Sequence, residues 1–97
     1  MRHVYLICYD ICDPKRLRQV HKTMKGAGDS VQYSVFRCEL SLMEKQDLMS
    51  DLWDIINPSV DRFLFANLGP AKRSGRENLE YWGDPREQPD QTNSIVL

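Results

Sequence analysis

The chain has 97 residues, of which 41% are hydrophobic, and a formal net charge of −1 at pH 7. A chain of this length most simply forms one domain, 1–97, with a core at 1–68 and a C-terminal extension at 69–97. The apolar share is ordinary and argues against disorder. No apolar run approaches the roughly 20 residues of a membrane span, and the N-terminus lacks a signal-peptide layout, so we expect a cytoplasmic protein without a membrane partner.

The charge is unevenly distributed along the chain. Residues 1–40 carry seven Lys or Arg and four Asp or Glu, whereas residues 41–97 carry six and ten. A basic half therefore stands beside an acidic half, and the small net charge does not exclude an anionic partner.

Apolar runs and cap residues predict a strand followed by a helix. The strand covers 2–10 and is apolar on both faces. Asp13 suits the N-cap of the helix, Pro14 its first position, and Gly26 or Gly28 its end. One face of this helix has cations and no anion, which is typical either of phosphate contact or of a solvated surface. These cations are Lys15, Arg18, Lys22 and Lys25, with Arg16 at the flank.

The stretch VQYSVFRCEL, 31–40, begins as a strand and then changes its pattern. Its apolar residues change parity between Val35 and Phe36. A strand alternates its side chains between two faces, so this change indicates a β-bulge or a break between two short strands. Bulges tend to lie beside active sites.

The second half of the core region repeats the helix and strand pattern. Ser41 and Glu44 form a capping box at the start of a second helix. An apolar strand at 59–69 follows, and 71–76 is a basic loop to which we assign no role. The final tetrapeptide SIVL, 94–97, is either an edge strand or a frayed tail.

This order of elements predicts an α+β, ferredoxin-like (βαββαβ) antiparallel sheet with two helices on one face. Such a fold leaves the other sheet face open. That face carries either Tyr5, Ile7 and Tyr9 or their opposite-parity neighbours, which are also apolar. We therefore expect a C2 homodimer packed sheet to sheet, and the C-terminal strand would pack on the partner subunit.

Asp10 is the strongest candidate for chemistry. It ends the first strand, and Asp13 already serves as the helix cap. A turn-forming Asp is the ordinary role at such a position. A two-fold axis nearby would instead join two Asp10 carboxylates into a site that binds Mg²⁺ and orients water against a phosphodiester. P-loop, G-x-S-x-G, H-E-x-x-H and G-x-G-x-x-G motifs are absent, and the cysteines match no zinc spacing.

These pieces, in this order and spacing, resemble the CRISPR-associated protein two family. The resemblance covers 3–68: an apolar strand ending in YDI, a basic helix behind an Asp, a glycine-bearing turn, and VQYSVF followed by CEL. It implies a ferredoxin-like homodimer and Mg²⁺-dependent endonuclease activity on RNA or DNA. It also implies a role in spacer acquisition, as the adaptor that holds DNA between copies of the integrase subunit.

The resemblance also assigns individual residues. Asp10 would be the catalytic residue and metal ligand, with Mg²⁺ shared between two copies of Asp10 at the dimer axis. The family often has an acidic residue after Phe36, whereas this chain has Arg37, which favours nucleic-acid binding. The other residues that the resemblance places around the site are Tyr9, Arg16, Arg18, Ser34 and Phe36.

Three functions compete on this basis. The first is a metal-dependent endonuclease acting on single-stranded RNA or duplex DNA. The alternative is a catalytically inactive DNA-binding adaptor that bridges integrase subunits. A regulatory module that binds a small ligand at its dimer interface ranks below both and would have no affinity for nucleic acid.

Overall fold

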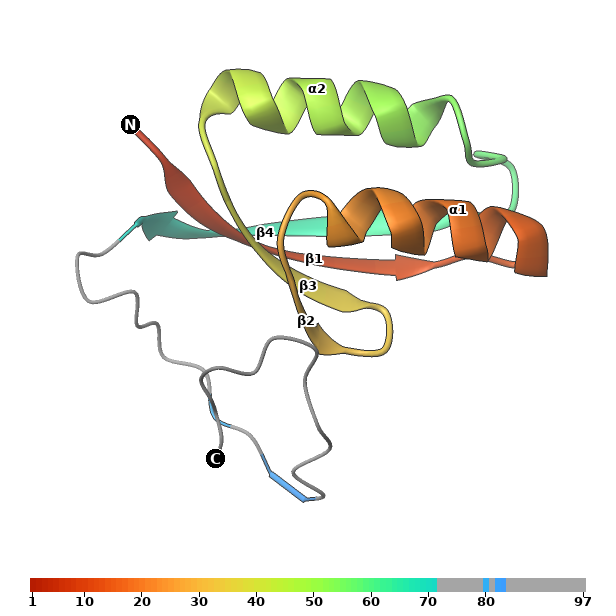
Figure 1. Ribbon diagram of the computed structural model, residues 1–97, viewed down its shortest axis with the longest axis horizontal. Coiled ribbons are helices and arrows are strands. Elements are labelled where there is room, and N and C mark those ends of the chain that lie inside the picture. The colour runs from red at the N-terminus through yellow and green to blue at the C-terminus, as the bar shows by residue number, and fades with distance from the viewer. Residues whose placement is uncertain (72–79, 81, 84–97) are drawn as a thin grey trace.

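The computed structural model describes residues 1–71, 80, 82 and 83. Four strands form one antiparallel sheet in the order β2-β3-β1-β4, and both helices lie on one face of it (Figure 1). This confirms the predicted ferredoxin-like α+β fold. The elements are β1 (His3–Asp10), α1 (Pro14–Lys25), β2 (Asp29–Gln32), β3 (Val35–Leu40), α2 (Leu42–Trp53) and β4 (Arg62–Pro70).

Part of the chain lies outside this description. The expected terminal strand at 94–97 and most of the basic loop, 72–76, fall outside the described residues. Neither helix of the described part is long and apolar enough to cross a membrane.

The helix ends follow the local signals in the sequence. The Asp13 carboxylate accepts a hydrogen bond from a backbone N–H in the first turn of α1, and Gly26 is the C-cap. At α2, the hydroxyl of Ser41 accepts from the backbone N–H of Glu44, whose carboxylate accepts in return from the backbone N–H of Ser41. These bonds satisfy backbone donors that a helix N-terminus leaves unpaired.

The core lies between the helices and one face of the sheet. Tyr5, Ile7 and Tyr9 of β1 point to this face and are buried. The sequence left open which of the two alternating sets of β1 side chains faces the helices. The structure shows that Tyr5, Ile7 and Tyr9 do, and the residues between them face away from the helices. The rest of the core cluster comes from both helices and β3: Val20, Met24, Phe36, Cys38, Leu40, Leu48 and Leu52.

The change of parity in 31–40 is a chain reversal. Strands β2 and β3 form an antiparallel hairpin whose turn is Tyr33–Ser34, and the register also shifts between Ser30 and Gln32. Two short strands are present as predicted, but the chain reverses at Tyr33–Ser34 and not between Val35 and Phe36, which both belong to β3. The backbone N–H of Tyr9 donates to the carbonyl of Ser34 at 3.1 Å, so this turn lies beside the end of β1.

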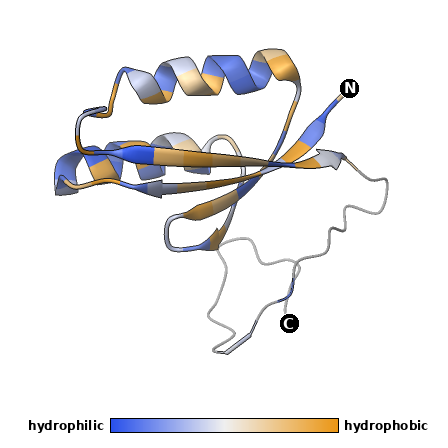
Figure 2. Ribbon diagram, turned by 180° about the vertical axis from the view of Figure 1, so that it is seen from behind, coloured by the Kyte–Doolittle hydropathy of each residue, from blue (hydrophilic) through white to orange (hydrophobic). Residues whose placement is uncertain are grey.

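The open face of the sheet carries apolar as well as charged residues. Leu6 of β1 and Leu64 of β4 project to this face, and Leu64 is 62% exposed. Figure 2, which colours residues of both faces alike, shows hydrophobic residues along much of the strands. Exposed apolar residues on a sheet face favour a protein partner, and the expected dimer stays a prediction.

Candidate functional site

Asp10 and Arg62 stand opposite each other at one end of the open sheet face. Asp10 is the last residue of β1, and it is in register with Arg62, the first residue of β4. Both residues are exposed. Directly opposed residues of antiparallel strands project to the same face with Cβ atoms about 4.5–5.5 Å apart. The Asp10 carboxylate and the Arg62 guanidinium therefore project from neighbouring positions on the same face of the sheet.

Tyr9 and Phe36 lie on the other side of the sheet from Asp10. Their rings stack with centroids 6.3 Å apart beneath the helices. The Tyr9 hydroxyl lies 3.2 Å from Nδ1 of His21 in α1. Burial raises the pKa of Tyr9, so its phenol stays protonated at neutral pH. In this protomer, the two aromatic residues support α1 and do not contact the Asp10 carboxylate.

Arg16 is held by Asp61, a residue that the sequence did not single out. The Arg16 Nε donates to Asp61 Oδ2 at 2.8 Å, and its Nη2 donates to Oδ1 at 3.3 Å. The same carboxylate accepts from the backbone N–H groups of Cys12 and Asn57, both at 2.9 Å. Asp61 is only 6% exposed. The hydrogen bond from Arg16 holds the pKa of Asp61 well below its usual range.

This carboxylate connects three segments at the edge of the site. Through its hydrogen bond from the backbone of Cys12, the carboxylate fixes the loop that follows Asp10. Asp61 itself immediately precedes Arg62. The Arg16 contact ties the first turn of α1 to the same point. We infer that Asp61 sets the relative positions of Asp10 and Arg62. In the sequence, Asp61 is visible only as an acidic residue at the start of an apolar strand, and the sequence does not show which residues it binds.

We expect Asp61→Asn to lower the thermal unfolding midpoint by several degrees at pH 7, because the Arg16 guanidinium and two backbone N–H groups lose a charged acceptor. A lowered carboxyl pKa stabilises the fold above the ordinary Asp pKa of about 4 and loses that effect as pH falls below it. The difference between variant and wild type should therefore shrink toward pH 3. Circular dichroism melts at both pH values, with exposed Asp47→Asn as control, test this; equal midpoints at pH 7 would contradict it.

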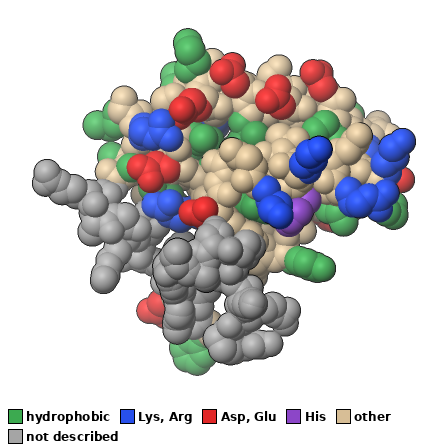
Figure 3. Space-filling view, in the orientation of Figure 1, with side chains coloured by type: hydrophobic (Ala, Val, Ile, Leu, Met, Phe, Trp, Pro, Cys, Tyr) green, Lys and Arg blue, Asp and Glu red, His purple; other side chains and the backbone are tan. Residues whose placement is uncertain are grey.

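The remaining predicted cations occupy separate surfaces. Apart from Arg16, the basic residues of α1 are exposed and gather on the right of the molecule, while acidic residues gather over α2 (Figure 3). Arg18 belongs to this basic surface. Arg37 lies on the open sheet face in register with Leu6, four residues from Asp10, and its guanidinium is 3.7 Å from Glu39. The structure therefore does not bring Arg37 directly to Asp10 within one protomer.

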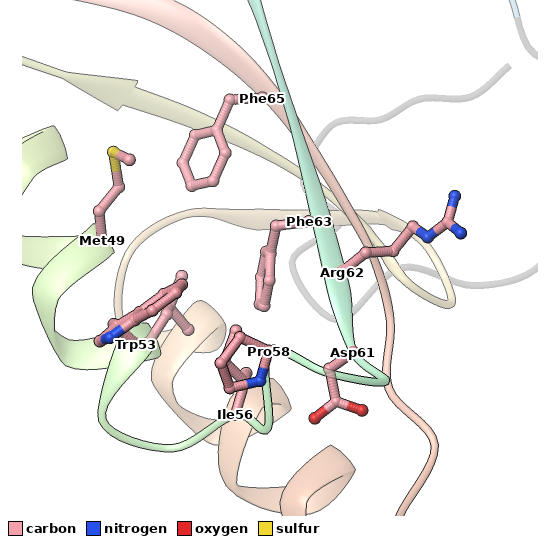
Figure 4. Close-up of a pocket in the computed structure, with 9 residues that line it drawn as sticks. Met49, Trp53, Ile56, Pro58, Asp61, Arg62, Phe63 and Phe65 are labelled. Carbon is pink, nitrogen blue, oxygen red and sulfur yellow. The ribbon is translucent and has the colours of Figure 1, made fainter.

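A mainly apolar pocket of about 370 Å³ lies between α2 and β4, and its lining includes Asp61 and Arg62 at the edge of the site. Met49 and Trp53 of α2 face Phe63 and Phe65 of β4 across it (Figure 4). Arg62 extends from the opposite side of β4, away from these aromatic rings (Figure 4). This view agrees with the register, which places Arg62 on the open face with Asp10.

One protomer offers an incomplete metal site. Among the described residues, no group of three or more His, Cys, Asp or Glu side chains is arranged to hold a metal. Mg²⁺ is bound in proteins through one or two carboxylates together with water and phosphate oxygens. Asp10 fits this donor set because it is exposed at a strand end, but a second copy or a substrate phosphate must supply further oxygens.

Comparisons with known proteins agree in both sequence and structure. The family model described as CRISPR associated protein Cas2 matches residues 1–75. Over 70 residues, covering 72% of this chain and 69% of the relative, the chain is 49% identical to CRISPR-associated endoribonuclease Cas2 1 of Rhodospirillum rubrum. Over 72 residues, covering 74% and 76%, it is 38% identical to CRISPR-associated endoribonuclease Cas2 of Geobacter sulfurreducens.

Solved structures show the same similarity. Streptococcus pyogenes Cas2 superposes with a TM-score of 0.65 at 34% identity, over 79% of this chain and 99% of that one. A hypothetical protein from Thermus thermophilus superposes with a TM-score of 0.76 over 91% of this chain and 99% of that one. At 23% identity this second likeness concerns the fold alone.

Proposed function

The chain belongs to the CRISPR-associated protein Cas2 family, and on this premise we propose that it is a metal-dependent endonuclease that hydrolyses phosphodiester bonds of RNA or DNA. The observation that carries the proposal is the exposed Asp10 carboxylate on the open, apolar face of the sheet. The Rhodospirillum rubrum and Geobacter sulfurreducens relatives are named endoribonucleases, which supports the same activity.

The proposed active form is a homodimer. The open sheet face exposes Leu64 and carries Asp10 at its end, so covering this face with a second copy would bury apolar surface. A two-fold axis near the strand ends would bring the two Asp10 carboxylates together. A strictly monomeric elution profile at micromolar concentration would contradict the dimer.

In the proposed mechanism, the two Asp10 carboxylates would hold Mg²⁺, and the ion would supply an activated water and shield the phosphate charge. Arg18 is exposed on α1, and we propose that it contacts the nucleic-acid backbone. Arg16 supports the site from its ion pair with Asp61.

Metal removal tests the nuclease proposal. We expect the purified protein to cleave labelled single-stranded RNA or duplex DNA in Mg²⁺, and cleavage to fall to background in EDTA. Adding Mg²⁺ in excess of the chelator should restore it, because the proposed site uses the metal to activate water. Cleavage that continues unchanged in EDTA would contradict a metal-dependent site.

The basic surface of α1 favours a second candidate function, a catalytically inactive adaptor that binds duplex DNA and bridges integrase subunits during spacer acquisition. Lys15, Arg18 and Lys22 are exposed on one helix face, where several phosphates can be contacted. For the triple change of these residues to Gln, we expect weaker DNA binding. The slope of log affinity against log salt should decrease by about 0.9 for each lost phosphate contact.

Fluorescence anisotropy between 50 and 200 mM salt measures this slope. The matched control is the double variant Asp47→Asn with Asp51→Asn, which changes exposed charges of α2 and should not weaken binding. An affinity for DNA that does not vary with salt would contradict the adaptor.

A further inference from the structure

Arg62 is placed to contact a ligand bound next to Asp10, which no other described cation of the same protomer can do. It stands directly opposite Asp10 in the β1–β4 ladder and shares the open face with it. Within the described residues, neither side chain forms a hydrogen bond or an ion pair with another side chain. The two charges therefore lie side by side, and both are accessible to a ligand.

The other arginines near this end of the sheet have different environments. The guanidinium of Arg16 is bound to the buried Asp61 carboxylate by two hydrogen bonds. Arg18 lies on α1, on the helix side of the sheet, whereas the Asp10 side chain projects to the open side. Arg37 is displaced along the sheet by four residues of β1 and lies near Glu39. Arg62 is thus the described arginine positioned next to Asp10.

The sum of the charges at the proposed site also indicates a need for a cationic side chain beside the phosphate. Two Asp10 carboxylates and one Mg²⁺ sum to zero, so the charge of a phosphodiester and the further negative charge of its transition state are not compensated by the metal site. An arginine presents a planar fork of N–H donors that matches two phosphate oxygens. Its guanidinium stays protonated at any working pH.

From this placement we infer that Arg62 binds the substrate phosphate beside Asp10. The inference rests on the proposed nuclease function and names a residue that neither the sequence pattern nor the family resemblance assigned. The simplest structural role, a cross-strand ion pair with Asp10, is not formed in this protomer. A phosphate located between the Asp10 metal and the Arg62 fork would be neutralised from two sides.

The test compares Arg62→Gln and Arg62→Lys with Arg2→Gln, which removes an equal charge from an exposed arginine at the other end of β1. We expect Arg62→Gln to lower kcat/KM for Mg²⁺-dependent cleavage at least tenfold, with an unchanged melting midpoint. The lysine variant should recover part of the loss, because it keeps the charge without the bidentate fork. Arg2→Gln should cleave at the wild-type rate.

A second measurement is independent of cleavage. Binding of single-stranded RNA in EDTA should lose about 0.7 from its salt slope in Arg62→Gln for each phosphate contact removed. A wild-type protein that does not cleave would overturn the nuclease proposal. The salt slope of RNA binding would then still test whether Arg62 contacts phosphate. An unchanged slope, or unchanged kcat/KM in a cleaving protein, would overturn the placement of phosphate at Arg62.

Discussion

Replacing Asp10 by Asn is expected to lower Mg²⁺-dependent cleavage by about 100-fold or more while the protein remains folded. The substitution preserves side-chain size but removes the negative charge that attracts the metal, and in a homodimer it removes both charges of the shared site. Asp10 is exposed and makes no hydrogen bond with another side chain among the described residues. Its loss should therefore change the free energy of unfolding by no more than about 0.5 kcal/mol.

Cleavage of labelled RNA and duplex DNA, measured in parallel with thermal melts and elution profiles, tests this expectation. Asp47→Asn is the matched control, since it removes one exposed carboxylate from the outer face of α2. Binding of nucleic acid in EDTA should persist in Asp10→Asn. This result would distinguish the loss of cleavage from a loss of the nucleic-acid binding that the adaptor function requires. Full-rate cleavage by Asp10→Asn would show that another site or a contaminant is responsible.

Gly28→Ala is expected to lower the free energy of unfolding by about 2–3 kcal/mol, the upper part of the range for overpacked sites. A Cβ atom at this position would clash with the carbonyl oxygen of Arg37 and would lie 2.5 Å from Sγ of Cys38. The Cα of Cys38 is also only 3.0 Å away. Relief would require the loop after α1 to move away from β3, because backbone atoms contribute to the clash.

Gly26→Ala provides a control two residues away. A Cβ at Gly26 meets only the carbonyl oxygen of Thr23, at 3.5 Å, and the φ angle of Gly26 is −79°. Alanine adopts this conformation without strain and reduces the entropy of the unfolded chain, so we expect a gain of about 0.4–1 kcal/mol. Urea unfolding of the two variants measures the difference. A Gly28→Ala variant as stable as Gly26→Ala would contradict the close approach.

The helix ends could be predicted because their interactions are local. The N-cap bond of Asp13 and the capping box of Ser41 and Glu44 join residues three positions apart, so the sequence contains both partners of each bond. The parity change at 31–40 was visible for the same reason. Whether it marked a bulge or a reversal depended on the pairing of β2 with β3, which is not a local property.

Nearness in sequence to Asp10 was a poor guide to the site within one protomer. Tyr9 is adjacent to Asp10 along the chain, yet the pleat of β1 sends its side chain beneath the helices, together with Phe36. Ser34 does lie beside the end of β1, through its carbonyl. The sequence showed that both faces of β1 are apolar but did not show which one the helices would cover.

The sequence by itself determined the order of the elements, their caps, and Asp10 as a carboxylate at a strand end. Only the tertiary structure decided that Asp61 binds Arg16 and that Arg62 stands beside Asp10, because these partners are 45 and 52 positions apart in the chain. Such pairs depend on strand register. A slip of one residue between β1 and β4 would move Arg62 to the helix side, and no local pattern in the sequence specifies that register.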